Sequence, residues 1–251
     1  MRRWIPLALR LAVLVLLSAF IAMPQWFAPV FQPLAENNAP AIYDQGSLLV
    51  LTLLHLRTVA IATVAATLVA VGLAIFVTRP SGREFLPLSR SLANIGQTFP
   101  PVAVLALAVP AFGFGEMPTL IALFLYGLLP IFENTLTGLT TLPEPVMEAA
   151  RGAGMTQLEC LTQVELPLAF PVILAGIRLS VVISLATATI GSTVAAKTLG
   201  EVIIAGLLSN NLAFVLQGGL IVGALAILIY DGFTGLERLA ARRTGRVVAD
   251  A

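Results

Sequence analysis

The sequence predicts an all-α integral membrane protein with about six transmembrane helices. Of its 251 residues, 58% are apolar and only 11% are charged, whereas an ordinary soluble domain carries about 25% charged residues. A soluble core of this size needs a charged surface that this composition does not supply. Long apolar blocks also recur along the whole sequence, and the basic residues gather at one end of these blocks. We therefore expect one membrane domain with no soluble enzyme domain attached.

The first apolar block, Ile5–Met23, follows the basic start Met1-Arg2-Arg3. This order also fits a secretory signal peptide. The apolar stretch is long, however, and Phe20-Ile21-Ala22 lacks the first small residue of a cleavage site. We therefore interpret the block as an uncleaved first span. The loop that follows it, Pro24–Ser47, has no basic residue, as expected of a translocated segment.

Five further apolar blocks complete the count of six spans. A spanning helix needs about 20 residues, and the second block is close to that length. Pro100-Pro101 interrupts the third block, and the fourth is short. Such segments are tolerated in a membrane only where other protein shields their backbone. The predicted boundaries are Thr58–Val77, Leu92–Phe112, Thr119–Phe132, Phe170–Thr193 and Phe214–Phe233.

The basic residues predict the orientation of these spans, because cytoplasmic loops carry an excess of Lys and Arg. With a cytoplasmic N-terminus, 12 of the 14 basic residues lie at the inner side, and only Arg57 and Lys197 lie at the outer side. Both termini and the long polar loop Glu133–Pro167 are then expected in the cytoplasm.

Several kinds of chemistry are excluded or disfavoured by composition. The formal net charge of +1 argues against nucleic acid as a partner. Cys160 is the only cysteine and His55 the only histidine, so an intrachain disulfide and a Cys/His metal cluster are excluded and a Ser-His triad is disfavoured. We expect no catalytic residue, no cofactor and no metal ion in this chain.

The polar loop Glu133–Pro167 predicts two short helices joined at a glycine. Pro143 and Pro145 suit the start of the first helix, with Glu144 near its positive end. Gly154 provides the backbone freedom that ends the first helix. Thr156 and Glu159 have the spacing of a capping box for the second helix, which we expect Pro167 to close. The first helix carries a stripe of small apolar residues, namely Val146, Ala149, Ala150 and Ala153.

Two interpretations of this hairpin are open from the residues alone. It can lie on the membrane surface without a partner, or its small side chains can let another protein approach closely. Alanines favour the second interpretation, because burial in lipid would suit bulkier residues.

The spacing within the loop resembles a known signature. Glu148-Ala149-Ala150, three residues, Gly154, nine residues and then Val164-Glu165-Leu166-Pro167 is similar to the EAA motif of ATP-binding-cassette (ABC) importer permeases. The resemblance implies that Glu148, Ala149, Ala150, Gly154, Val164, Leu166 and Pro167 couple the chain to an ATPase. It also implies that Glu148 positions the loop through hydrogen bonds.

Other segments are similar to the osmoprotectant branch of these permeases, which serves glycine betaine, choline and carnitine. They are Gln97–Leu105, Pro171–Arg178 and Gly191–Gly200. The resemblance covers roughly residues 48–237. We accordingly divide the chain into a first helix and extracytoplasmic loop at 1–47, a transmembrane domain at 48–237 with the coupling loop at 133–167, and a basic cytoplasmic tail at 238–251.

The resemblance implies a type I ABC importer permease fold with a cytoplasmic coupling helix, in a bacterial inner membrane. The expected partners are cytoplasmic ATP-binding subunits that hydrolyse ATP, an extracytoplasmic solute-binding protein, a second permease subunit of the same or a different chain, and membrane lipid. An ATP-independent secondary transporter or channel is the alternative. The broken third span fits that alternative weakly, but no carboxylate falls at the centre of any block. An intramembrane enzyme would need a nucleophile–base pair or a metal cluster, and one histidine and one cysteine leave little from which to build either.

Small residues recur every fourth position in the fifth span, as Gly176, Ser180, Ser184, Ala188 and Ser192. We predict close helix packing there and at the Gly219/Gly223 pair, although a polar pathway including Thr187, Thr189 and Thr193 is the alternative. The stretch Gly191–Thr198 departs from a P-loop at Ala196 and is expected at the outer end of a span, so we predict no nucleotide site.

Ionisable residues near the span ends are interpreted as structural. Glu133, Arg178 and Asp231 lie close to the predicted inner boundary, and His55 and Arg57 are expected at the outer interface. Aromatic rings could hold a quaternary ammonium solute by cation–π attraction. Nothing in the spacing selects any of Phe99, Phe124, Tyr126 and Tyr230, so the substrate-binding residues stay unassigned.

Overall fold

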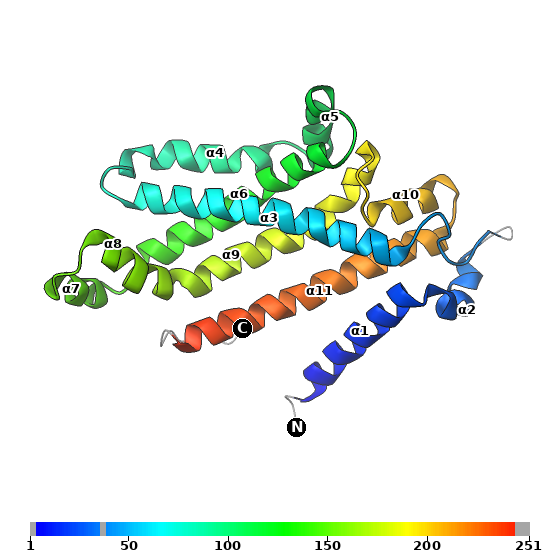
Figure 1. Cartoon of the computed structure of the whole chain (residues 1–251), viewed down its shortest axis with the longest axis horizontal. Coiled ribbons are helices and arrows are strands. Elements are labelled where there is room, and N and C mark those ends of the chain that lie inside the picture. Colours follow the sequence, from blue (N-terminus) through cyan, green and yellow to red (C-terminus); the bar gives the residue numbers. More distant parts are fainter. Residues whose placement is uncertain (1–3, 36–38, 244–251) are drawn as a thin grey trace. The chain divides into compact units, whose positions relative to one another are not determined.

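The computed structural model describes residues 4–35 and 39–243, and every regular element in these ranges is a helix. Figure 1 labels the elements in chain order. The α-helices are α1 Trp4–Ala22, α2 Ala28–Phe31, α3 Leu48–Thr78, α4 Leu86–Thr98, α5 Pro101–Phe112, α6 Glu116–Thr140, α7 Glu144–Gly152, α8 Gln157–Glu159, α9 Leu166–Thr187, α10 Gly200–Leu208 and α11 Leu212–Arg243. A π-helical segment, Cys160–Glu165, joins α8 to α9.

The described helices confirm a multi-span membrane fold. Four of them are long and apolar enough to cross a membrane: α3, α6, the helical run Gln157–Val194 that contains α9, and α11. The number rises to six when each of two bent helix pairs counts as one span. The predicted count of about six spans is therefore reached only if the first and third spans, which correspond to the two bent helix pairs, each count as one.

The third predicted span is broken where Pro100-Pro101 interrupts it. Phe99 and Pro100 have extended backbone, with ψ values of 141° and 143°, because a residue before proline avoids the helical region. On the α4 side, Gln97 Nε2 donates to the carbonyl of Tyr126 at 3.0 Å, and the Tyr126 hydroxyl donates to the carbonyl of Phe99. The break is thereby fastened to α6.

Three other predicted spans are shorter than the helices that contain them. Helix α3 begins at Leu48 rather than at Thr58, α6 continues to Thr140 rather than ending at Phe132, and α11 continues through Arg243. Charged and polar residues occur at the extended ends of α6 and α11, whereas the missed start of α3, residues 48–57, is mainly apolar. The first residues of the predicted coupling loop are thus the last two turns of α6, and the start of the predicted tail is helical. Residues 244–251 of that tail lie outside the described residues.

The described chain forms two compact units, and the four long helices each contribute to both. The first unit comprises Met1–Ala62, Pro100–Leu123 and Val182–Ile229. Its core packs Leu17 and Phe20 of α1 with Phe214 and Ile221 of α11. Phe20 also stacks on Phe31 of α2, with ring centroids 5.4 Å apart.

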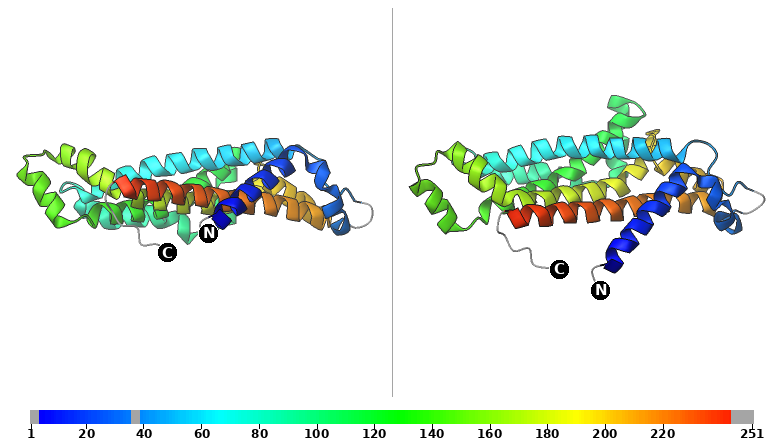
Figure 2. Two further views of the ribbon diagram at one scale, coloured as in Figure 1. Left: turned by 90° about the horizontal axis from the view of Figure 1, so that it is seen from below. Right: turned by 60° about the horizontal axis from the view of Figure 1, so that its bottom comes forward.

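The second unit comprises Thr63–Phe99, Phe124–Val181 and Tyr230–Ala251. Its core places Ala66, Ala70 and Ala74 of α3 in one buried cluster with Ile131 and Phe132 of α6. The alanines recur every fourth residue, so they form one face that lets a neighbouring helix approach closely. Within this unit, Figures 1 and 2 show α7 and α8 as a hairpin at one end, where α6 finishes and the run into α9 starts.

Candidate functional site

The hairpin formed by α7, α8 and the π-helical segment Cys160–Glu165 contains most of the predicted coupling residues. Helix α7 begins as the sequence predicts. Pro143 has extended backbone (φ −61°, ψ 124°), Glu144 lies in the first turn, and Pro145 is at one of the first positions, where a missing N–H costs nothing. The Glu144 carboxylate lies 3.7 Å from Arg151, and both side chains are mostly exposed, so this pair adds little stability.

Gly154 ends α7 in a Schellman motif. The N–H of Gly154 donates to the Arg151 carbonyl at 3.0 Å, and that of Met155 donates to the Ala150 carbonyl at 3.2 Å. This pair of hydrogen bonds requires left-handed backbone at the first residue after the C-cap of the helix. Gly154 supplies it with φ +77°. Ala150, which faces Met155 across this turn, is buried.

The outer face of α7 presents small side chains to the surroundings. Val146, Glu148, Ala149 and Ala153 are exposed, and Val146 retains 39% of its surface. A Cβ added at Gly154 would meet nothing within 4 Å. No hydrogen bond or ion pair of the Glu148 side chain is found among the described residues, and the side chain is exposed. Glu148 is thus free to contact something outside.

The second half of the hairpin begins as predicted but does not end as predicted. Thr156 Oγ1 accepts from the Glu159 N–H at 3.3 Å, and Glu159 Oε2 accepts from the Thr156 N–H at 2.7 Å. This is the expected capping box. Pro167, however, lies in the first turn of α9 and does not close the helix. The π-helical segment Cys160–Glu165 precedes it, and its wider turn accommodates a proline that would disrupt an α-helical interior.

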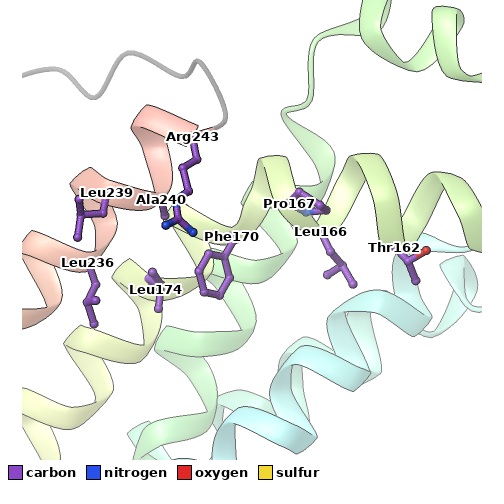
Figure 3. Close-up of a pocket in the computed structure, with 9 residues that line it drawn as sticks. All are labelled: Thr162, Leu166, Pro167, Phe170, Leu174, Leu236, Leu239, Ala240 and Arg243. Atoms are coloured by element: carbon purple, nitrogen blue, oxygen red, sulfur yellow. The ribbon is translucent and has the colours of Figure 1, made fainter.

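The two halves of the motif lie on different elements. Glu148, Ala149, Ala150 and Gly154 lie on α7 and its terminal turn, whereas Val164 is in the π-helical segment and Leu166 and Pro167 begin α9. Leu166 and Pro167 line a mainly apolar groove of about 560 Å³, opposite Leu236 and Leu239 of α11. Figure 3 shows these side chains, with Arg243 at the rim. The seven predicted residues therefore lie on three successive parts of the chain, with only the first four on α7 and its terminal turn.

Sequence reasoning missed one polar contact of the hairpin. Arg79, in the turn after α3, forms a two-point ion pair with Glu165, the last residue of the π-helical segment. Glu165 occupies a position that the motif leaves free, and 86 residues separate the partners. No local spacing in the sequence indicates such a contact.

Comparison with known proteins decides the class. The model of the family described as binding-protein-dependent transport system inner membrane component matches residues 66–245. The chain belongs to this family. It is a multi-pass membrane permease subunit of an ABC importer, and the ATP-independent transporter or channel that the sequence left open is set aside.

Named relatives resemble the permease over most of its length. The osmoprotectant import permease protein OsmY of Salmonella typhimurium is 39% identical over 185 residues, which cover 74% of this chain and 78% of the relative. The choline transport system permease protein OpuBB of Bacillus subtilis is 39% identical over 184 residues, covering 73% and 84%. The glycine betaine/carnitine/choline permease protein OpuCB of Bacillus subtilis is 38% identical over 196 residues, covering 78% and 86%.

Solved structures confirm the type I importer fold. The inward-facing MetNI methionine ABC transporter matches with a TM-score of 0.67 at 18% identity, covering 75% of the permease and 93% of the matched chain. An amino acid ABC transporter matches with a TM-score of 0.60 at 19% identity, covering 77% and 92%.

In the second unit of the permease, the ionisable residues near the span ends are paired. Arg178 Nε lies 3.0 Å from Glu237 Oε1, Arg178 Nη1 donates to Thr234 at 3.0 Å, and the guanidinium lies 4.4 Å from the centroid of Tyr230. Glu133 pairs with Arg90 at 2.6 Å. These contacts are consistent with the structural interpretation of Arg178 and Glu133, and the ring of Tyr230 is occupied by a cation of the permease itself.

In the first unit, His55 lies inside the protein. His55 is fully buried, its Nε2 lies 3.1 Å from the Leu185 carbonyl, and its Nδ1 accepts from the Leu199 N–H at 3.4 Å. Both ring nitrogens thus link α3 to backbone, as in the neutral tautomer with the proton on Nε2. Arg57 is mostly exposed and pairs with Glu116 at 2.5 Å.

Close packing is confirmed for part of the small-residue ladder. Ser180, Ser184 and Ala188 are buried, and a Cβ at Gly176 would lie 2.8 Å from the Pro130 carbonyl oxygen of α6. At Gly219 and Gly223 the packing prediction fails within the described chain, because an added Cβ would meet nothing within 4 Å. That pair faces outward on α11.

Proposed function

We propose that the permease imports a quaternary ammonium osmoprotectant such as glycine betaine or choline. The support comes from the relatives named above, whose names specify osmoprotectants, choline, carnitine or glycine betaine. In this proposal a binding protein delivers the solute from outside, and separate cytoplasmic subunits hydrolyse ATP. A second permease subunit completes the pathway, and residues 48–237 form this chain's share of it.

We further propose that α7 and its terminal turn dock against an ATP-binding subunit. The carrying observation is the exposed face of small side chains on α7 that ends at Gly154, a left-handed residue with open space around its Cα. Such a face lets a partner backbone come close, and the free Glu148 carboxylate can contact the partner. Glu148, Ala149 and Gly154 would form the contact, and the buried Ala150 would support the turn behind them. Val164, Leu166 and Pro167 would connect it to α9.

The proposed mechanism is mechanical. Closure of two ATP-bound subunits would displace α7, and the displacement would pass through the Schellman turn and the capping box into α9. Because α8, the π-helical segment and α9 form one continuous run, a push on the hairpin reaches a candidate span directly. The pathway would then open outward, and solute would be released inward after hydrolysis. Both termini and the hairpin are placed in the cytoplasm in this proposal.

Co-purification tests the docking contact. Gly154→Asp places a side chain on left-handed backbone, which is less favourable than glycine there, and adds a charge that must be desolvated in the contact. We expect the variant to insert normally and to lose most of the co-purifying ATPase subunit. Glu148→Ala should lose less, since it removes one contact without strain.

Gly152→Ala is the matched control for Gly154→Ala. Gly152 is exposed in the same turn region and has open space, but its backbone is helical. Gly152→Ala should leave ATPase recovery unchanged while Gly154→Ala lowers it. If wild type, Gly154→Ala and Gly154→Asp all recover the same amount of ATPase subunit, α7 is not part of the docking site.

A further inference from the structure

The ion pair between Arg79 and Glu165 links the hairpin to a second candidate span. Arg79 Nη1 donates to Glu165 Oε1 at 3.1 Å, and Arg79 Nη2 donates to the other carboxylate oxygen. The side chains retain 23% and 9% of their surface. A two-point contact between guanidinium and carboxylate fixes both distance and orientation, so the pair constrains how far the two segments can separate.

The backbone at Arg79 is held firmly on the α3 side. Its N–H donates to the Phe76 carbonyl at 3.1 Å, and its carbonyl accepts from Gly82 and Arg83 at 3.0 and 3.1 Å. The turn also lies directly against the helix, because a Cβ at Gly82 would come within 2.1 Å of the Phe76 carbonyl oxygen. Only glycine permits this approach, so the turn and the end of α3 form one rigid piece.

On the hairpin side, Glu165 differs from the other charged residues. The segment between α6 and α9 contains five charged side chains, which are Glu144, Glu148, Arg151, Glu159 and Glu165. Glu144 and Arg151 face each other, Glu159 caps its own helix, and Glu148 is exposed. Among the described residues, Glu165 is the one of the five that pairs with a residue outside the hairpin.

We propose that the Arg79–Glu165 pair transmits movement of the hairpin to α3. The inference rests on the proposed docking of α7 to an ATPase. Displacement of the hairpin would reach α9 through the continuous chain and α3 through this pair, so that two candidate spans move together. Arg79 and Glu165 are positioning residues in this scheme, since neither needs to touch the ATPase or the solute.

Loss of the pair should therefore separate ATP hydrolysis from transport. Glu165→Gln keeps the shape of the side chain but removes its charge, and Arg79→Gln removes the cation. In both variants α7 and Gly154 are unchanged, so ATPase docking should persist. The link to α3 should weaken because a hydrogen-bonded charge pair is lost, and solute taken up per ATP hydrolysed should fall clearly below the wild-type ratio.

The test uses the complete transporter in proteoliposomes, with its ATPase subunits, its binding protein and radiolabelled glycine betaine or choline as the probe. Recovery of the ATPase subunit, ATP hydrolysis and uptake are measured for each variant. The reciprocal exchange, Arg79→Glu with Glu165→Arg, should restore at least part of the uptake that either single change removes. Glu133→Gln is the matched control, because it breaks the Arg90–Glu133 pair of the same unit without touching the hairpin.

The expected result is normal ATPase recovery and continued hydrolysis with low uptake in Glu165→Gln, rescue by the exchange, and no effect of Glu133→Gln. Wild-type uptake per ATP in Glu165→Gln would overturn the proposal. So would a loss of uptake in proportion to lost assembly. A Gly154→Asp arm separates the two proposals: normal ATPase recovery there refutes the docking site, whereas lost recovery with a normal Glu165→Gln variant refutes only the transmitting pair.

Discussion

Two side-chain amides hold the non-helical segment that precedes α3. The N–H of Tyr43 donates to Gln217 Oε1 at 3.1 Å, and Gln217 Nε2 donates to the Ala41 carbonyl at 2.7 Å. Asn211 Nδ2 donates to the Pro40 carbonyl at 2.8 Å. Backbone outside a helix must find partners when it is buried, and Gln217 of α11 and Asn211, just before α11, supply them. The tyrosine ring then lies buried beside Glu201 of α10.

This environment gives Tyr43 an unusual titration. Burial, and then the negative charge of Glu201, raise the pKa of Tyr43 from 10 to about 12. Because the raised pKa favours the neutral phenol in the folded state, the stabilisation is present below about pH 10. It is lost as the pH rises through about 12. We expect phenolate absorbance to show a component with a pKa near 12 that Tyr43→Phe removes. Titration of all three tyrosines together near pH 10 would contradict this account.

At the scale of the element, glycines in the spans have opposite roles according to their surroundings. Gly176 of α9 lies against α6, where a Cβ would come within 2.7 Å of Asn134 Cβ and 2.8 Å of the Pro130 carbonyl oxygen. Gly219 of α11 has open space. The same residue type therefore allows close helix contact at one position and leaves an uncovered surface at the other.

Alanine substitutions at these two positions should have opposite effects on stability. Gly176→Ala overpacks the contact between α9 and α6 and should cost about 1–3 kcal/mol. Gly219→Ala adds a methyl group without a clash and should be neutral or stabilising by about 0.5–1 kcal/mol, because alanine favours the helix. Thermal unfolding midpoints of the two purified variants measure the difference. A lower midpoint for Gly219→Ala than for Gly176→Ala would refute the assigned packing.

The sequence predicts local signals of the hairpin more accurately than its tertiary contacts. The capping box at Thr156 and the glycine turn at Gly154 follow from residue types a few positions apart, and the structure contains both. The continuation past Pro167 was missed, because a π-helical segment has no established signature in one sequence. The burial of His55 was also missed, since its partners are backbone groups of Leu185 and Leu199.

At the scale of the whole molecule, composition and the lengths of the apolar blocks predict a membrane protein. The number of spans is four or six, depending on how the two bent helix pairs are counted. The four unbroken candidates were recognised from hydropathy, but their ends extend beyond the predicted apolar blocks, and some charged residues in these extensions are paired. Arg57 with Glu116 and Arg90 with Glu133 are examples. Fold class and family thus follow from the sequence, whereas the Arg79–Glu165 contact required three-dimensional structure.

The orientation of the spans stays a prediction, and cysteine labelling tests it. In a Cys160→Ala background, single cysteines are placed at Gln45, at Gln157 in the hairpin and at Asp250. We expect an impermeant maleimide to label only the Gln45→Cys protein in intact cells, and all three proteins after the membrane is opened. Labelling of Gln157→Cys or Asp250→Cys in intact cells would reverse the proposed topology.

The central claim is that the hairpin of α7 and α8 couples ATP hydrolysis to transport. ATP-driven uptake of radiolabelled glycine betaine or choline into proteoliposomes measures it most directly, with the binding protein present and wild type compared with Gly154→Asp. The spans are untouched by this substitution, so the variant should insert and pair with its second permease subunit. The account predicts that its uptake and its solute-stimulated ATP hydrolysis are lost. Wild-type uptake by Gly154→Asp would contradict it.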